Sequence, residues 1–426
     1  MTLYILLFII ILAALIGTPL FAVILAVAMI GFYHSGVDLS VITIEIYRIA
    51  DTPLLMALPL FTLSGYIMAE SKTSKRLVRL THVFFGWMPG GLAIVALVTC
   101  ALFTAFTGAS GVTIVAIGAF LYPALKQSQY DDKFSLGLVT TSGSLGLLFP
   151  PSLPLILYGI IAQQMNTGQG VTISNLFLAG ILPGILMVVL LSCWSLWTSR
   201  NNNETKMPFS AKEAFAAIRE AAWEIPLPLF VLIGVYGGLL TISEVAAVTT
   251  IYIIVIEVFI YKEIKLSRLP GVMRDSMIVC GGILLILGVS LTLTNYLIDA
   301  QVPMKLFKFI QEMVTNKITF LILLNIFLLM LGAILDIFSA LVIMVPIILP
   351  VAVSYGIDPV HLGIIFLANM QIGYFTPPVG MNLFIASYRF NKPIAELYKA
   401  SIPFMIVLLI ALLIITYWPG LSMVFL

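Results

Sequence analysis

The sequence predicts an all-α polytopic membrane protein made of two inverted repeats, and two observations carry this prediction. Hydrophobic residues make up 61% of the 426 residues and charged residues only 9%, whereas a soluble domain has about 25% charged residues. Two Pro-Pro pairs, Pro150-Pro151 and Pro377-Pro378, lie 227 residues apart inside long apolar segments. The same offset relates three further pairs: Pro123 and Pro350, Asp131 and Asp358, and Gly146 and Gly373.

Apolar runs that approach the ~20 residues of a membrane span predict the helical segments in order. These runs cover 3–33, 53–70, 92–125, 134–164, 171–199, 224–261, 275–298, 318–353, 360–388 and 402–424. The first run is interrupted at Gly17-Thr18-Pro19 and the sixth at Thr241-Ile242-Ser243-Glu244, so each is predicted to form two helices. We expect the first run to stay in the protein, because it lacks the basic start and cleavage site of a signal peptide.

Basic residues then set the orientation. With the N-terminus outside, the clusters within 72–79, 200–219, 262–274 and 389–399 all face the cytoplasm, as the positive-inside rule requires. The connectors left outside hold few basic residues, and Lys305, Lys308 and Lys317 are the exception to this pattern. The second half then starts from the side opposite to the first, so we predict a first repeat over 1–200, a cytoplasmic linker over 201–222 and an inverted second repeat over 223–426, with both chain termini outside.

The stretches 92–125 and 318–353 are predicted to be re-entrant hairpins. Leu92 to Phe106 gives only about 22 Å of helix, short of the ~30 Å hydrocarbon core, before the polar sequence 107–111. The second stretch is interrupted at Asp336-Ile337-Phe338-Ser339. The alternative is a tilted single helix whose small residues serve helix packing, but a carboxylate at mid-membrane depth favours a polar site.

Amphipathic pieces precede both hairpins. The segments 71–90 and 299–317 are predicted to be arm helices in the membrane interface, with plain solvated connectors as the alternative.

The Pro-Pro pairs predict that the helices over 134–164 and 360–388 unwind in mid-course, because proline lacks a backbone donor and fixes φ. Freed carbonyl groups at membrane depth can coordinate Na⁺, and the N-termini of half-helices attract anions. Oxygen-bearing side chains near the two breaks suit a hard cation: Thr141, Ser142, Ser144, Asn369, Gln371, Thr376 and Asn382. The alternative is a kinked structural helix with capped ends.

Other chemistries find little support. The sequence contains neither an HExxH motif nor a GxxxxGK[ST] phosphate loop, so we predict no enzyme and no direct use of ATP. Cys100, Cys193 and Cys280 are isolated in apolar stretches and are predicted to be free thiols. Glu244 and Glu257 are interpreted as contacts between helices or subunits, with proton carriers as the alternative.

The same residues carry a family resemblance. The segments 107–111 (TGASG), 146–154 (GLLFPPSLP), 336–339 (DIFS) and 373–382 (GYFTPPVGMN) resemble the large membrane subunit of tripartite ATP-independent periplasmic (TRAP) transporters, and the resemblance covers essentially the whole chain. It implies a Na⁺-driven, elevator-type importer of organic acids in the bacterial inner membrane, with both termini periplasmic. A separate small four-helix membrane subunit and a periplasmic substrate-binding protein are the implied partners. Sialic acid is our first expectation for the substrate, with a C4-dicarboxylate-like carboxylate next, and a passive channel is the alternative function.

Within this framework we expect two transported Na⁺ ions and no organic cofactor. One site joins Ser110 with Gly146, and the other joins Ser339 with Gly373 and Thr376. The full set of expected Na⁺ contacts is Thr107, Gly108, Ser110, Gly146, Pro150, Asp336, Ser339, Gly373, Thr376 and Pro377, and the expected substrate contacts are Ser152, Asn369, Thr376 and Asn382. The expected stationary scaffold comprises 3–33, 171–199, 224–261 and 402–424, and the arms connect it to the moving hairpins and broken helices.

Overall fold

The structure, a computed structural model, confirms an all-helical membrane protein. It describes residues 1–426 except 1–5, 7–8, 11, 14–15, 17, 51–52, 89, 166–169, 202–209, 237–238 and 315, and the described residues form helices and turns without a strand. Among the described residues, six helices are long and apolar enough to cross a membrane: α11 (Ile173–Thr198), α14 with its π-helical extension (Ile242–Ile260), α15 (Leu269–Asp299), α17 (Lys317–Ile334), α18 (Ile337–Ser354) and α21 (Ile394–Tyr417). A bent pair, Asp132–Leu148 with Leu153–Gln164, is a possible seventh span.

Both predicted helix breaks are present. In the first half, α9 (Asp132–Ser142) and a 3₁₀ turn (η2, Leu145–Leu148) are separated from α10 (Leu153–Gln164) by a 41° bend at the proline pair. In the second half, α19 (Pro359–Gly373) ends before the proline pair and α20 (Met381–Phe390) follows it. Both Pro-Pro peptide bonds are cis.

The starts of the two broken helices match as well. Asp131 accepts hydrogen bonds from the backbone N–H groups of Lys133 and Phe134, and Asp358 accepts them from Val360 and His361. A carboxylate at this position satisfies donors that have no partner within the helix. The repeat read from the sequence therefore has a counterpart in local geometry, while the inverted orientation of the halves stays a prediction.

The two predicted hairpins are helix–turn–helix units. The first consists of α6 (Gly91–Thr107), α7 (Ser110–Ala116) and α8 (Gly118–Gln127), and the second of α17 and α18, which meet at Leu335-Asp336. Gly108 ends α6 with φ +64°, a conformation that favours glycine. Because α17 and α18 each reach 18 residues, a re-entrant course for 318–353 stays a prediction.

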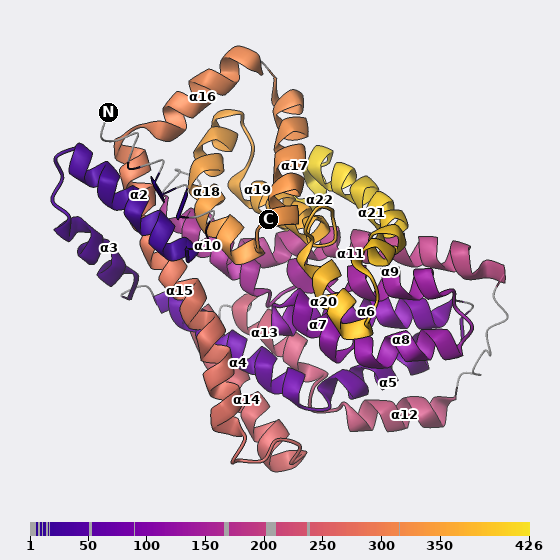
Figure 1. Cartoon of the computed structure of the whole chain (residues 1–426). Helices are drawn as coiled ribbons and strands as arrows, with labels where there is room; N and C mark the ends of the chain where they lie inside the picture. The colour runs from indigo at the N-terminus through magenta and orange to yellow at the C-terminus, as the bar shows by residue number, and fades with distance from the viewer. Residues whose placement is uncertain are drawn as a thin grey trace.

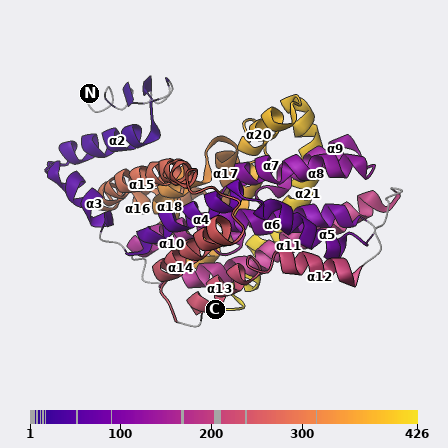
Figure 2. The ribbon, with the colours of Figure 1, turned by 90° about the horizontal axis from the view of Figure 1, so that it is seen from below.

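The predicted arms are the helices α5 (Thr73–Phe85) and α16 (Val302–Met313). They lie at separate ends of the molecule in Figure 1, with α16 above α15, α17 and α18. The part of the linker that the structure describes also contains a helix, α12 (Ala211–Glu220), which packs along α5 (Figure 2). The sequence analysis did not predict this helix.

Arg76 attaches α5 to neighbouring helices through a buried ionic cluster. Its guanidinium lies 2.6 Å from carboxylate oxygens of Glu224 and Glu263, 3.1 Å from Glu257, and over the ring of Tyr261. Burial by itself lowers the pKa of Arg76, but the bonds with Glu224 and Glu263 outweigh this and raise it, so the group stays charged. Glu257 therefore serves as a contact between helices, as the sequence analysis favoured.

The remaining helices form two groups. In the first, α2 (Leu20–His34), α3 (Ser40–Ala50) and α4 (Ala57–Glu70) pack on α15, α4 also packs on α14 (Ile242–Ile254), and α13 (Pro226–Tyr236) packs on α14. We call these six helices the α15 group.

The predicted breaks within 3–33 and 224–261 correspond to the start of α2 after Pro19 and to a capping box of Thr241 and Glu244 before α14, although much of 3–17 lies outside the described residues. Short helical turns complete the described chain: η1 (Pro53–Met56), η3 (Ser199–Asn201), η4 (Val255–Ile260) and α22 (Gly420–Met423).

The second group surrounds the helix breaks. Here α11 packs on α6, α19 and α21, and α21 packs on α9. The sequence analysis placed 171–199 and 402–424 in the scaffold; in the structure α11 packs on α6 and α19, and α21 packs on α9 and α19, which belong to the part predicted to move. They are long apolar helices that carry no signal of which neighbours they cover. The division into moving and stationary parts stays a prediction.

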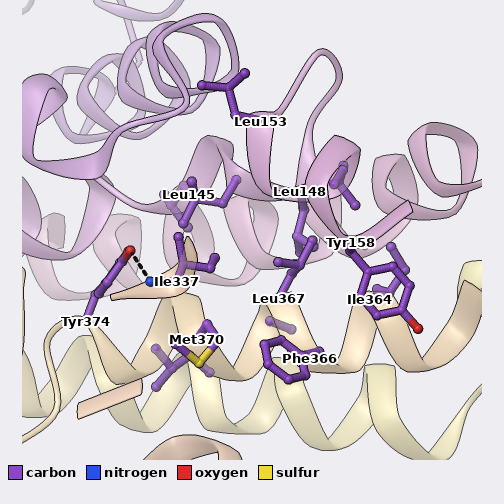
Figure 3. Packing of buried hydrophobic residues seen from close by; sticks show 14 of the residues in the cluster. Leu145, Leu148, Leu153, Tyr158, Ile337, Ile364, Phe366, Leu367, Met370 and Tyr374 are labelled. Carbon is purple, nitrogen blue, oxygen red and sulfur yellow. Dashed lines mark hydrogen bonds between the residues drawn. The ribbon is translucent and has the colours of Figure 1, made fainter. Parts of the chain in front are cut away.

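The main hydrophobic core lies between the two broken helices. Figure 3 shows Leu145 and Leu148 of η2 and Tyr158 of α10 facing Phe366 and Met370 of α19. Gly363 leaves room for the ring of Tyr158, whose hydroxyl donates to the Pro359 carbonyl. Through this core, η2 and α10 of the first broken helix pack directly against α19 of the second.

Candidate functional site

At the first break, the backbone lies directly against the first hairpin. A Cβ atom at Gly146 would collide with the backbone of Ala101 and Ala105 on α6. Next to it, the hydroxyl of Thr104 donates to the Gly143 carbonyl over 2.8 Å and lies 2.7 Å from the hydroxyl of Thr113. The unwound segment is therefore attached to both limbs of the hairpin.

The second break makes an equivalent contact. A Cβ atom at Gly373 would come within 2.6 Å of the Gly332 Cα atom on α17. Gly332 stands at the repeat offset from Ala105, so the two glycines 146 and 373 pack on matching places of the two hairpins. The N–H of Gly380 also donates to the Ala333 carbonyl over 3.0 Å.

The tip of the second hairpin is organised by Asp336. One carboxylate oxygen accepts from the backbone N–H groups of Phe338 and Ser339 at 3.0 Å, and the other accepts from the Ser339 hydroxyl. The N–H of Ile337 donates to the hydroxyl of Tyr374 over 2.9 Å, which joins the tip to the second break (Figure 3). The predicted contacts Asp336, Ser339 and Gly373 therefore lie in one region.

The tip of the first hairpin carries unpaired oxygen. Gly108 lies against the side chain of Leu153, at the start of α10. The hydroxyls of Thr107 and Ser152, the residues that precede these two, are buried and have no hydrogen-bond partner. A buried polar atom without a partner is costly unless a ligand or water satisfies it. Thr107 and Ser152 therefore leave two buried hydroxyl oxygens free to bind a ligand at this junction.

The two halves also contact each other at the breaks. The Ser110 hydroxyl donates to the Asn382 side-chain oxygen over 2.8 Å, and the Asn382 amide donates to the Thr140 carbonyl over 3.4 Å. The Ser144 hydroxyl donates over 3.1 Å to the carbonyl of Gln371, its counterpart at the repeat offset. The first hairpin tip and both breaks thus share one buried polar region.

Three predicted residues lie elsewhere or bond differently. Asn369 donates to the side-chain oxygen of Asn325 on α17 and to the Ile365 carbonyl, while its own side-chain oxygen is buried and has no hydrogen-bond partner. Thr376 donates to the Ile372 carbonyl of its own helix. Ser110 contacts Gly143 and Asn382 rather than Gly146. Their roles as ligands stay predictions.

The two breaks differ in exposure. Pro150 is half-buried, and Pro151 and Ser152 are buried, whereas the segment Pro377-Pro378-Val379 is exposed. Among the described residues, no group of three or more His, Cys, Asp or Glu side chains could hold a metal ion. A cation here would depend on hydroxyls, carbonyls and the single carboxylate of Asp336.

Sequence reasoning missed several residues that build this region: Thr104, Asn325, Gly332, Tyr374 and Gly380. Asn325 could have been found, because an amide inside an apolar membrane helix is expensive without a partner. Gly332 could have been found only by pairing it with Gly373. Nothing in the sequence indicated that the hydroxyl of Tyr374 would accept a hydrogen bond from the hairpin tip.

Comparison with known proteins agrees with the resemblance. Residues 3–421 match the family model described as the tripartite ATP-independent periplasmic transporter, DctM component. The C4-dicarboxylate TRAP transporter large permease protein DctM of Pseudomonas aeruginosa is 33% identical over 383 residues, which is 90% of this chain and 88% of the relative. The isethionate TRAP transporter permease protein DctMQ of Oleidesulfovibrio alaskensis is 34% identical over 87% of this chain and 58% of its own length.

A solved structure supports the fold. The YdaH transporter of Alcanivorax borkumensis, described as having an unusual topology, superposes with a TM-score of 0.60 over 89% of this chain and 87% of its own. Its sequence identity is 14%, so the likeness concerns the fold alone.

Proposed function

Because this chain belongs to the family of DctM components of tripartite ATP-independent periplasmic transporters, we propose that it imports an organic acid across the bacterial inner membrane with a Na⁺ gradient as the energy source. The observation that carries this proposal is the repeated contact between a helix break and a hairpin. Glycines at matching positions bring unwound backbone against matching places on two hairpins. Two such contacts around one buried polar region are typical of a carrier that binds ions and substrate at its centre.

We place one Na⁺ at each junction. At the first, the candidates are the free hydroxyl oxygen of Thr107, the hydroxyl oxygen of Ser110, which donates to Asn382, and nearby carbonyl groups. At the second, the candidates are Asp336, Ser339 and the backbone of Gly373 to Thr376. Oxygen donors of this kind suit a hard monovalent cation.

The names of the relatives support a small anionic substrate. C4-dicarboxylate and isethionate are both compact anions, and exposed backbone at the second break could receive one. We therefore favour a C4-dicarboxylate-like carboxylate, and sialic acid, our first expectation, gains no support from these relatives. Asn382 and Ser152 remain the proposed substrate contacts nearest to both breaks.

Uptake into proteoliposomes tests the proposal directly. The chain is reconstituted with its proposed partners, a separate small membrane subunit and a periplasmic binding protein, and radiolabelled succinate is supplied with an inward Na⁺ or K⁺ gradient. We expect accumulation above the external concentration only with Na⁺. Equilibration without accumulation would favour the passive channel, and accumulation with K⁺ alone would rule out Na⁺ coupling.

The ion sites are tested by Ser110→Ala and Ser339→Ala. Each variant should need a several-fold higher Na⁺ concentration for half-maximal uptake, because a ligand oxygen is lost. Ser354→Ala is the matched control, since that hydroxyl caps a carbonyl at the exposed far end of α18. Unchanged Na⁺ dependence in both site variants would remove these serines from the ion sites.

An elevator motion is the mechanism we propose, with the hairpins sliding against the α15 group. A short thiol crosslink between positions 290 of α15 and 342 of α18, where the Ser290 hydroxyl donates to the Val342 carbonyl over 2.6 Å, should then stop uptake in a background without native cysteines. A crosslink between positions 64 and 250, which joins α4 to α14 through hydroxyls 3.0 Å apart, should leave uptake intact. Full uptake with the first crosslink in place would rule out this motion.

A further inference from the structure

An apolar groove lies between the second arm and the second hairpin. Its volume is about 350 Å³, and it is lined by α16, α17 and α18, including Leu306, Phe309, Phe327, Met344 and Ile347. Phe309 and Phe327 are exposed at its edge. Every lining side chain is a hydrocarbon or thioether group, so the groove suits an apolar occupant.

The direction of the groove suits a lipid chain. Its lining runs along α17 from Phe320 to Phe327 and along α18 from Met344 to Val351, about 10 Å along each helix at 1.5 Å per residue. Both helices are long and apolar enough to cross a membrane. The arm lies over one end of both helices in Figure 1. A hydrocarbon chain in the groove would therefore run parallel to the spans, with its polar end next to α16.

The arm carries positive charge that the protein does not neutralise. Lys305 and Lys308 are exposed on one side of α16, and neither has an ion-pair partner among the described residues. Glu312 offsets one of these charges, and Lys317 at the start of α17 adds another. Helical spacing places Phe309 between this lysine pair and the groove-lining Leu306 and Ile310. Lys305 therefore lies next to the groove's edge at Phe309, and Lys308 lies one turn further along the exposed side of the arm.

The first arm provides the contrast. On α5, Arg76 and Arg79 are both paired with protein carboxylates from η4, α12 and the segments beside them, and Lys75 lies over the ring of Phe120. The lysines of α16 are also the exception to the positive-inside rule, so topology does not account for them. A negatively charged ligand from outside the chain would account for both facts.

We propose that this groove binds one anionic phospholipid of the bilayer, with an acyl chain between α16, α17 and α18 and its phosphate group beside Lys305 and Lys308. Burial of the chain supplies the affinity, and the lysines supply the preference for a net negative headgroup. The bound lipid fills the space between arm and hairpin and completes their packing. The ligand is a constituent of the membrane and is distinct from the transported acid.

Native mass spectrometry of the full chain in detergent tests this site. Phosphatidylglycerol and phosphatidylcholine with identical palmitoyl and oleoyl chains are titrated separately, and the dissociation constant of the first bound lipid is measured. We expect phosphatidylglycerol to bind several-fold more tightly. In the Lys305→Gln, Lys308→Gln double variant that preference should disappear, so that the two lipids bind with nearly equal affinity, while phosphatidylcholine binding stays the same.

A groove-filling variant tests the position of the chain. Ile347→Trp should weaken the binding of both lipids, because its indole occupies the groove. Val189→Trp is the matched control: Val189 lines another apolar groove, between α6, the first break and α11, and its replacement should change nothing. Equal affinity for the two lipids, an unchanged preference in the double lysine variant, or an equal effect of both tryptophans would each overturn the proposal. If Ile347→Trp fails to fold, the lysine variant alone decides.

Discussion

The two halves of this chain share a backbone plan and differ in what surrounds it. Both have an aspartate cap, a cis Pro-Pro break and a glycine that packs on a hairpin. Yet Pro151 and Ser152 of the first break are buried, while the segment 377–379 of the second is exposed. The difference shows that duplicated backbone geometry does not determine access, because neighbouring helices decide which break is covered.

The two arm helices also differ in their surroundings. The first arm, α5, is bound by a buried arginine and by ion pairs to α12, whereas the lysines of the second arm, α16, have no protein partners among the described residues. The first arm is thus fixed by the chain itself, and the second is left to contacts with its surroundings. Substitutions in matched places test how far this contrast extends.

The largest effect is expected at Arg76. Replacing it by Met should leave Glu224 and Glu257 buried without their counter-charge, which costs about 3–5 kcal/mol when one partner of a buried pair is removed. The thermal unfolding midpoint in detergent, followed by tryptophan fluorescence, should fall steeply. The matched change in the second arm, Lys308→Met, should shift the midpoint little. Similar midpoints for the two variants would remove the contrast between the arms.

Alanine at the two packing glycines is expected to have the next largest effect. Gly146→Ala and Gly373→Ala each place a methyl group against hairpin backbone that cannot yield easily, at a cost of about 1–3 kcal/mol, and uptake should fall in both. Gly282→Ala on α15 is the control, since nothing lies within 4 Å of its Cβ position; it should be neutral or slightly stabilising. If only one glycine tolerates alanine, the two junctions are not equivalent.

The helix breaks and the helix–turn–helix segments could be predicted from the sequence because they depend on local rules, whereas the inverted repeat and the re-entrant course stay predictions. Proline removes a donor, aspartate caps a helix, and a short apolar run ends at small polar residues wherever the chain lies. The partners of each element were much harder to predict. Nothing in the composition of α11 or α21 indicates that they cover the breaks, and α12 was interpreted as part of a polar linker although its amphipathic face packs on α5.

The candidate site shows the same limit. Asp336 and Ser339 were predicted together because both stand in the polar interruption of the second hairpin, and they do bond to each other. The contact of Ser110 with Asn382 joins residues from opposite halves, and a single sequence carries no signal for such a pairing. Asn369 was assigned to substrate from its nearness to the break; its amide nitrogen donates to Asn325 while its side-chain oxygen has no partner, so the assignment stays a prediction.

Asp336 and Asp131 provide a test that separates capping from ion binding. Both carboxylates cap a helix, so Asp336→Ala and Asp131→Ala should each lose about 1 kcal/mol of stability. Only Asp336→Ala should also abolish Na⁺-driven uptake, because only Asp336 lies at a hairpin tip. Uptake and unfolding are measured on the same preparations. Normal uptake by inserted Asp336→Ala protein would show that its carboxylate is only a cap.

The smallest effect is expected at Arg79, which lies on the same helix as Arg76. Arg79 pairs with Glu213 and Glu220 of α12, but all three side chains are more than 40% exposed. Exposed ion pairs contribute about 0–1 kcal/mol and weaken with salt, whereas buried ones are screened much less. Arg79→Gln should therefore lower the unfolding midpoint slightly in dilute buffer and not at all in about 1 M NaCl, where the Debye length is about 3 Å, and Arg76→Met should be equally harmful in both. A large, salt-independent loss at Arg79 would mean that α12 and α5 are joined mainly by apolar packing around this side chain. The linker helix would then be as firmly fixed as the buried cluster beside it.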